Sequence, residues 1–304
     1  MNAYVIAGVI LLLLLAADVF LTVFQSQGRG GPLNRRQNRL VWQVFRLVGV
    51  RGLGKVHGAW LNLAAPTMAV LTVFVWVLLL VAGFALIYYP WILTFLASPG
   101  SLRTPWIEAL YYSGYTAATL GFGDVVPDRE WIRLLAPLQA FGGFALLTVS
   151  ITYLLAIYQE LLVMQTLARG IAAYAEANPS VIARLGDAEG GGAASSWSEQ
   201  VAEQVLHTLQ AHYQYPILHY FRPVDGGQAL PVQLGVLLDP LSRAGPAVPH
   251  PSACLLKESL RLYVREVDTH FVPQRGQGRE EPQGDAEETR HAHERLLRYM
   301  GYRT

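Results

Sequence analysis

Three long apolar segments stand out along the chain, and each is long enough to cross a bilayer. They run from Tyr4 to Phe24, from Met68 to Tyr89 and from Leu134 to Tyr158. A transmembrane helix needs about 20 apolar residues, because the hydrocarbon core is about 30 Å thick and a helix rises about 1.5 Å per residue. The pattern therefore predicts three spanning helices. We expect the first to be an uncleaved span, because no basic region precedes its apolar core and no small-residue cleavage motif follows it.

A fourth segment, Thr104 to Ala118, has the pattern of a helix but is too short to cross the membrane. It begins with threonine at a capping position, Pro105 at the first helical position and Glu108 in the first turn, which are typical of a helix N-terminus. A helix of this length spans about 22 Å, less than the bilayer requires. The segment is therefore predicted to be a re-entrant helix.

The backbone after this short helix carries the candidate chemistry. The residues are Thr119, Leu120, Gly121, Phe122, Gly123 and Asp124. Irregular backbone at membrane depth has to be buried in protein or face water, because an unsatisfied peptide group in lipid costs several kcal/mol. If the two glycines adopt backbone angles that other residues disfavour, successive carbonyls can point the same way. Four such strands around an axis would replace the water shell of a cation with rings of oxygens.

This segment resembles the pore loop of tetrameric potassium channels, whose usual filter reads T-V-G-Y-G-D. Thr119, Gly121, Gly123 and Asp124 match it outright, whereas Leu120 and Phe122 replace Val and Tyr. The resemblance covers about residues 67 to 160. It implies an all-α pore module of outer helix, pore helix with filter, and inner helix, assembled as a homotetramer. It also implies that K⁺ binds to the backbone carbonyls of Thr119, Leu120, Gly121 and Phe122.

The same resemblance indicates further site residues. Tyr112 and Tyr115 are expected to support the filter, with Tyr112 as the partner of Asp124. Gly143 is in register with the hinge glycine of the family's inner helix, although close packing against a neighbouring helix explains such a glycine equally well. Residues at three- and four-residue spacing would then line the cavity and gate: Phe144, Leu147, Ile151 and Leu155. A glycine-rich GFGD alone also fits a tight turn, but the order of capped helix, filter and glycine-bearing span favours a pore.

The distribution of charge predicts the orientation. The chain has 23 Lys or Arg and 22 Asp or Glu residues, so its net charge indicates no nucleic-acid partner. Residues 25 to 66, however, contain basic residues and no acid, and such loops face the cytoplasm. We therefore expect a plasma-membrane protein with its N-terminus outside and its C-terminus in the cytoplasm.

The basic linker itself has an amphipathic pattern from Leu33 to Val50. We expect this helix to lie on the inner leaflet, where basic residues attract anionic lipid: Arg35, Arg36, Arg39 and Arg46. A voltage sensor is excluded because these charges lie outside any span. Asp18 lies within the first span, near its cytoplasmic end, where it can pair with Arg29 or reach water; we favour a structural role for it over a functional one.

The composition excludes several classes of protein. The chain is 52% hydrophobic and 15% charged, which is too apolar for an ordinary soluble protein of this size. The single cysteine, Cys254, excludes an intramolecular disulfide framework. No nucleophile elbow, helical metal-ligand pair or phosphate loop is present, so we expect neither an enzyme nor a cofactor. Five histidines in the C-terminal half have spacings that fit no compact metal site: His207, His212, His219, His291 and His293.

The predicted organisation has four parts. Residues 1–27 form an N-terminal transmembrane helix, 28–66 a basic amphipathic linker, 67–165 a pore domain and 166–304 a mostly helical cytoplasmic region. We expect the inner helix to continue past its membrane span through Gln165 and Ala168, followed by another helical piece from Ile171 to Ala177. Further on we expect a flexible linker over 186–195, proline-rich turns over 223–251 and a disordered polar stretch before a final helix. The leading function is passive K⁺ conduction. The alternatives are a membrane-anchored sensor or scaffold that uses the pore module only for assembly, and a cation-transporter subunit, which would need four pore loops in one chain.

Overall fold

The computed structural model describes residues 2–24, 30–51, 61–97, 104–187, 194–223, 226–243, 250–272, 285–300 and 302. These residues are mostly helical, and three of their helices are long and apolar enough to cross a membrane. The predicted all-α membrane fold is therefore confirmed. The chain divides into two compact units. The membrane unit comprises Met1–Gln43 and Pro66–Ala156, and the C-terminal unit comprises Val44–Ala65 and Ile157–Thr304.

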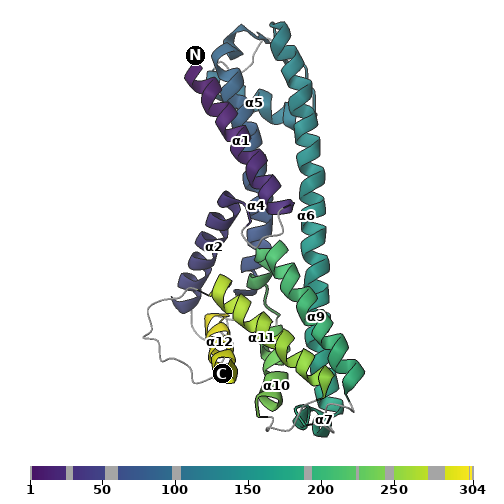
Figure 1. The fold of residues 1–304 in the computed structure, drawn as a ribbon. Coiled ribbons are helices and arrows are strands. Elements are labelled where there is room, and N and C mark those ends of the chain that lie inside the picture. The colour runs from purple at the N-terminus through teal and green to yellow at the C-terminus, as the bar shows by residue number, and fades with distance from the viewer. Residues whose placement is uncertain are drawn as a thin grey trace. The chain divides into compact units, whose positions relative to one another are not determined.

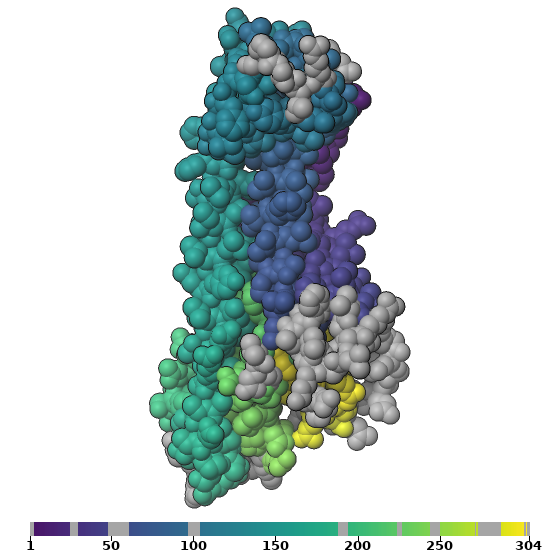
Figure 2. Space-filling view, turned by 180° about the vertical axis from the view of Figure 1, so that it is seen from behind, coloured from purple at the N-terminus to yellow at the C-terminus, as the bar shows by residue number. Residues whose placement is uncertain are grey.

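The three predicted spans correspond to α1 (Asn2–Val23), α4 (Ala64–Tyr88) and α6 (Glu130–Ala177). Helix α1 packs closely on α4, since a Cβ atom at Gly8 would lie 2.5 Å from the carbonyl oxygen of Gly83. A short 3₁₀ helix, η1 (Tyr89–Thr94), follows α4. The side chains of α4 and α6 lie next to each other in the membrane unit (Figure 2), where the rings of Trp76 and Tyr153 are 5.6 Å apart.

Helix α6 continues beyond the membrane span, as predicted, and extends further than Ala168. It continues without interruption to Ala177, so the separate helical piece expected from Ile171 onward is wrong. The reason is that Gly170 is the only helix-disfavouring residue near that position, and a single glycine costs only about 1 kcal/mol in a helix. The predicted end before Asn178 and Pro179 is confirmed, and α7 (Pro179–Ala183) follows.

The helix predicted to be re-entrant corresponds to α5 (Pro105–Ala117), and it lies between α4 and α6 in the membrane unit (Figure 1). Thr104 occupies the N-cap position, but its side chain makes no capping hydrogen bond. We refer to Thr119–Asp124, the predicted filter, as the filter segment. Beyond it, the chain forms β2 (Val125–Val126), which pairs antiparallel with β1 (Leu96–Ala97). This two-residue ladder fixes the end of the filter segment to the loop after η1.

The linker helix is α2 (Pro32–Arg51), close to the predicted range. Its buried residues are Asn34, Asn38 and Trp42, which face protein, whereas Leu40 and Val44 are exposed. The amphipathic pattern is therefore real, but the side of α2 that contacts the rest of the membrane unit is lined by two asparagines. The basic residues Arg29 and Lys55 lie outside the described residues.

The C-terminal unit adds α9 (Ser195–Gln214), η2 (Pro216–Tyr220), η3 (Gly226–Gln228), α10 (Leu230–Arg243), α11 (Pro251–Phe271) and α12 (Asp285–Met300). The turns expected over 223–251 are contradicted by α10, because Leu230, Leu234, Leu237 and Leu241 recur at helical spacing and are buried. Most of the predicted linker and polar stretch, residues 188–193 and 273–284, lies outside the described residues.

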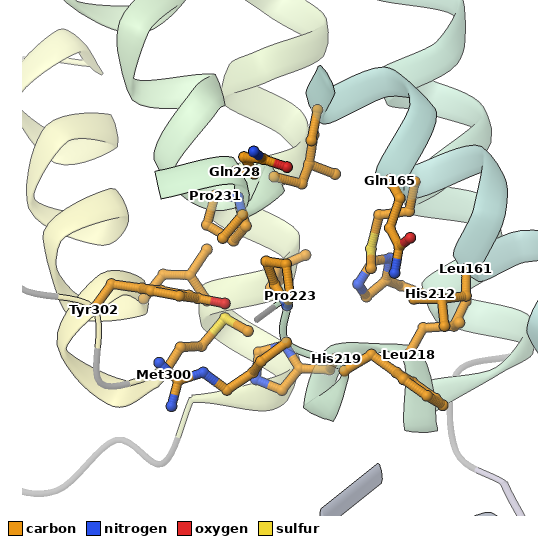
Figure 3. Close-up of a pocket in the computed structure, with 18 of the residues that line it drawn as sticks. Leu161, Gln165, His212, Leu218, His219, Pro223, Gln228, Pro231, Met300 and Tyr302 are labelled. Atoms are coloured by element: carbon orange, nitrogen blue, oxygen red, sulfur yellow. The ribbon is translucent and has the colours of Figure 1, made fainter. Parts of the chain in front are cut away.

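The C-terminal unit is built around the continuation of α6. Ile157, Leu161 and Ile171 of this helix are buried, and Tyr174 stacks on Trp197 of α9 with ring centroids 3.9 Å apart. Close to Leu161 a cavity of about 20 Å³ lies between α6 and the later helices (Figure 3). That volume holds about one water molecule, so this cavity belongs to the core rather than to a ligand site.

Candidate functional site

The segment from Thr119 to Gly123 has an unusual backbone. Its φ angle is 58° at Thr119, 59° at Gly121 and 74° at Gly123, and the two residues between them have negative φ. The positive φ predicted for both glycines is therefore present, and Thr119 shares it despite a steric cost of about 1–2 kcal/mol. Alternation in the sign of φ can turn successive peptide groups to the same side, as in other backbone ion sites.

The carbonyl oxygens of this segment are available to a ligand. Among the described residues, none donates a hydrogen bond to the carbonyls of Thr119, Leu120, Gly121 or Phe122. The segment is also exposed on the surface of the single chain. An exposed run of unbonded carbonyls on strained backbone is a candidate cation site, because the oxygen dipoles can replace water around a desolvated ion.

Two backbone hydrogen bonds connect the filter segment to α5. The Thr119 amide donates to the carbonyl of Thr116 at 3.0 Å, and the Leu120 amide donates to the carbonyl of Tyr115 at 2.9 Å. The segment thus begins directly at the C-terminal end of α5. The unpaired carbonyls of a helix C-terminus carry partial negative charge, which favours a cation close to this end.

Tyrosine hydroxyls hold the other end of the segment. The buried Tyr115 hydroxyl donates to the Val125 carbonyl at 2.6 Å, directly after the filter. The Tyr111 hydroxyl donates to Asp124 Oδ2 at 2.7 Å on the exposed side. The ring of Phe122 lies 5.6 Å from that of Tyr115. The phenylalanine therefore packs against the residues that brace the filter.

The predicted contact between Tyr112 and Asp124 is wrong, because Tyr111 makes it. Adjacent residues on a helix point about 100° apart, and α5 is rotated so that Tyr111 faces the filter. Tyr112 is buried and lies edge-on to Tyr88 and Phe95, at 4.9 and 5.1 Å between ring centroids. It fixes α5 to the outer helix instead.

A polar bridge that the sequence analysis missed fixes α5 between α4 and α6. The buried Gln139 Nε2 donates to the Ser113 carbonyl at 2.8 Å and to Ser113 Oγ at 2.7 Å. Ser113 Oγ in turn donates to the Val81 carbonyl at 2.7 Å. A glutamine in an apolar span is the signal that could have revealed it, since polar groups in lipid need partners.

Gly143 lies where α6 contacts the end of α5. A Cβ atom at this position would be 2.0 Å from the carbonyl oxygen of Ala117. At the adjacent Gly142 the nearest atom would be 3.9 Å away, at Leu80. Helix α6 is unbroken here, so close approach to α5 is the role that the geometry supports, and bending remains a prediction.

The predicted gate residues form an exposed apolar stripe on α6. Between half and two thirds of each side chain is accessible: Phe144, Leu147, Ile151 and Leu155. The stripe extends toward the start of α6 through Leu138 and Phe141. A continuous apolar surface of this kind marks contact with another protein surface or with lipid.

Asp18 is buried at the N-terminus of α2 within the membrane unit. Its Oδ1 accepts hydrogen bonds from the amides of Leu33 and Asn34 at 2.8 and 3.3 Å, and its Oδ2 accepts one from Trp76 Nε1 at 2.9 Å. A carboxylate at a helix N-terminus is stabilised by the helix dipole. The carboxylate therefore attaches α2 to α4, next to the contact between Trp76 and Tyr153 of α6.

Comparison with known families shows that the part of the chain that contains this site is similar to an ion-channel domain. Residues 71–160 match the model of the family described as "Ion channel". The matched range contains most of α4, all of α5, the filter segment and the membrane half of α6. The resemblance drawn from the residues is confirmed at the level of an ion-channel domain in a membrane protein.

A longer similarity extends beyond that domain. The chain is similar to the uncharacterized membrane protein YdjJ of Bacillus subtilis strain 168, with 22% identity over 287 residues that cover 92% of this chain and 83% of that protein. No solved structure matches the chain.

Proposed function

We propose that four copies of this chain assemble into a potassium-selective channel of the plasma membrane. The observation that carries the proposal is the alternating sign of φ from Thr119 to Gly123, with four carbonyls that accept no hydrogen bond from the described residues. Rings of such carbonyls coordinate K⁺ in place of water. Conduction is passive, and the filter backbone replaces the hydration shell without any chemical step.

Assembly follows from the number of ligands that an ion needs. One chain contributes a single carbonyl to each level of the filter, which cannot replace a hydration shell, whereas a closed ring of four chains supplies complete sets. The exposed apolar side chains Leu120 and Phe122, 58% and 60% accessible in the single chain, support this assembly. In the tetramer, neighbouring pore helices cover them, and the stripe from Phe144 to Leu155 lines the inner cavity.

Flux measurements in liposomes test this function. Purified protein should release K⁺ far faster than Na⁺, and barium should block the release. Gly123→Ala should abolish selective flux, because alanine is strained at a φ of 74°. Gly170→Ala is the matched control, since a Cβ atom there meets nothing within 4 Å. Equal passage of Na⁺ would refute selectivity.

The oligomeric state is tested separately by native mass spectrometry of the protein in nanodiscs. Tetramers are expected, and a monomer that carries flux would contradict the assembly. A tetramer that conducts no ion would instead favour the scaffold function, in which the pore module serves assembly only.

We also propose that α2 binds anionic lipid on the cytoplasmic side. The arginines that would contact headgroups are exposed: Arg35, Arg36, Arg39 and Arg46. Each basic residue near an anionic surface contributes about 1 kcal/mol. Flux should therefore respond to phosphatidylglycerol in the liposomes, and a variant with all four arginines replaced by glutamine should lose that response. An unchanged response would refute lipid binding at α2.

A further inference from the structure

A second cavity, of about 390 Å³, opens between α10, α11 and α12 and lies entirely in the C-terminal unit. Its volume falls in the range of about 300–1,000 Å³ that is typical of small-molecule sites. Leu238 and Leu241 form an apolar part of its wall, and the other lining residues are mostly charged. The cavity is unrelated to the filter and needs a separate explanation.

The carboxylates of the cavity already have cationic partners. Each has a carboxylate oxygen within 4 Å of an arginine nitrogen: Asp239 pairs with Arg243 at 2.7 Å, Glu294 with Arg298 at 3.3 Å and Glu258 with Arg261 at 3.7 Å. Two of these arginines, Arg243 and Arg298, are not among the residues that line the cavity. The negative charge of the lining is therefore compensated.

Two cations of the lining have no such compensation. Among the described residues, Lys257 of α11 has no hydrogen bond or ion pair, although its side chain is half-buried. Arg290 of α12 donates to the uncharged Ser242 Oγ at 3.2 Å and pairs with no carboxylate of the described chain. Cations in a concave site without acidic partners favour an anionic ligand, and guanidinium groups bind phosphate and carboxylate in particular.

We propose that this cavity binds a small organic anion, with a phosphate or carboxylate group held by Lys257 and Arg290 and an apolar body against Leu238 and Leu241. An apolar wall together with a few polar groups is the combination that small-molecule sites use for affinity and orientation, and here Leu238 and Leu241 supply the wall and the two cations the polar groups. The source of the anion is either a soluble metabolite or a lipid headgroup, and the two share this chemistry.

The cavity is connected to α6 by direct packing within the C-terminal unit. Arg295 of α12 binds Asp268 of α11 at 2.5 Å, and α11 lies along α9. Helix α9 contacts α6 through the stacked rings of Trp197 and Tyr174. A ligand that shifts α12 against α11 thus acts on the helix that continues into the pore. This effect on conduction rests on the proposed function, but the binding itself does not.

Binding is tested on the full-length protein in phosphatidylcholine nanodiscs by isothermal titration calorimetry with phenyl phosphate. Phenol, which lacks the charge, and inorganic phosphate, which lacks the ring, should both bind more weakly. Lys257→Gln and Arg290→Gln should each weaken phenyl phosphate binding about tenfold, because each removes a charge-assisted hydrogen bond. Arg265→Gln is the matched control, since Arg265 lies on α11 outside the cavity and pairs with Glu266. This variant should bind phenyl phosphate with the affinity of the wild type.

A steric variant separates a cavity from general attraction to positive charge. Leu238→Trp places a larger side chain against the apolar wall of the cavity without changing its charge, so it should weaken binding of the phenyl ring while the thermal unfolding midpoint stays near that of the wild type. The titration is repeated in nanodiscs that contain phosphatidylglycerol. If phenyl phosphate no longer binds there, the lipid headgroup occupies the cavity and is the source of the anion. If phenyl phosphate binds equally well, the natural anion is a soluble one. Equal affinity of wild type, Lys257→Gln and Leu238→Trp would overturn the proposal, whether or not the protein conducts K⁺.

Discussion

The candidate site of the membrane unit uses main-chain atoms, whereas that of the C-terminal unit uses side chains. In the membrane unit the candidate ligands are main-chain carbonyls between Thr119 and Phe122, and the side chains around them only hold that backbone in place. In the C-terminal unit the candidate ligands are side chains of Lys257 and Arg290 from separate helices. The first site therefore depends on backbone angles within a few residues, and the second on how distant helices pack.

The largest effect is expected where the membrane unit is most tightly packed. Gly143→Ala places a Cβ atom 2.0 Å from the Ala117 carbonyl oxygen, and overpacking of this kind costs about 1–3 kcal/mol and occasionally more. Flux through liposomes should be lost. Gly142→Ala is the control one residue away, where the nearest atom is 3.9 Å distant, and it should conduct normally. If both variants conduct, the Gly143 Cα atom and the Ala117 carbonyl oxygen are further apart than in the structure.

A second test compares a buried and an exposed carboxylate. An asparagine at position 18 has one oxygen and one NH₂ group. In either orientation of its amide, the NH₂ group faces an N–H donor, either the α2 amides or Trp76 Nε1. Asp18→Asn should therefore lower the free energy of unfolding by about 2–3 kcal/mol. Asp128→Asn should cost less than about 0.5 kcal/mol, because the hydrogen bond that Asp128 accepts from Thr94 is exposed to solvent. Thermal unfolding of the purified protein measures both. Equal midpoints would contradict the capping role of Asp18.

The C-terminal unit should respond to acid through His219. Burial, reinforced by the neighbouring His212, lowers the pKa of His219 from 6.5 to about 3. Between these values the unfolded chain binds the proton and the folded chain does not, so stability is lost as the pH falls below about 6.5. From pH 6.5 to about pH 5 the loss is about 2 kcal/mol for this residue.

His219→Gln should remove that part of the pH dependence. The measurement is the unfolding midpoint of the full-length protein at about pH 7.5 and about pH 5, where the variant should lose less stability than the wild type. His207→Gln is the control, because His207 is exposed and lies 3.7 Å from Glu160. If the unfolding midpoint of the wild type falls no further between the two pH values than that of His219→Gln, then His219 does not stay neutral in the folded protein.

The same contrast explains what the sequence could predict. The positive φ at Gly121 and Gly123 depends on local pattern and the three spans depend on apolar length, so both could be predicted from the sequence. The choice between Tyr111 and Tyr112 was not, because it depends on how α5 is rotated, and that rotation is fixed by Ser113 contacts to Val81 and Gln139. The sequence favoured a structural role for Asp18 but could not identify Trp76 as its distant partner.

In the C-terminal unit, local signals misled. Pro231 and Pro240 suggested turns, yet both lie in α10. Pro231 lies in the first turn of α10, where a proline loses no hydrogen bond. Pro240 lies inside the helix, and burial of the leucines on one face of α10 offsets its free-energy cost. The leucine spacing was visible in the sequence, but the proline content concealed it. Neither the cavity of α10, α11 and α12 nor its uncompensated cations could be predicted, since they require three helices to be placed together.

The smallest expected effect tests whether side chains of the membrane unit only support the backbone. Tyr111→Phe removes the hydroxyl that donates to Asp124 Oδ2, and a solvent-exposed bond of this kind contributes about 1 kcal/mol or less. The fold should therefore survive with an unchanged unfolding midpoint, while the outer end of the filter loses one constraint and K⁺ flux changes up to about fivefold. Tyr112→Phe is the matched control, because Tyr112 packs on Tyr88 and not on Asp124. Should Tyr112→Phe alter flux more than Tyr111→Phe, α5 would be rotated from the orientation in which Tyr111 faces the filter.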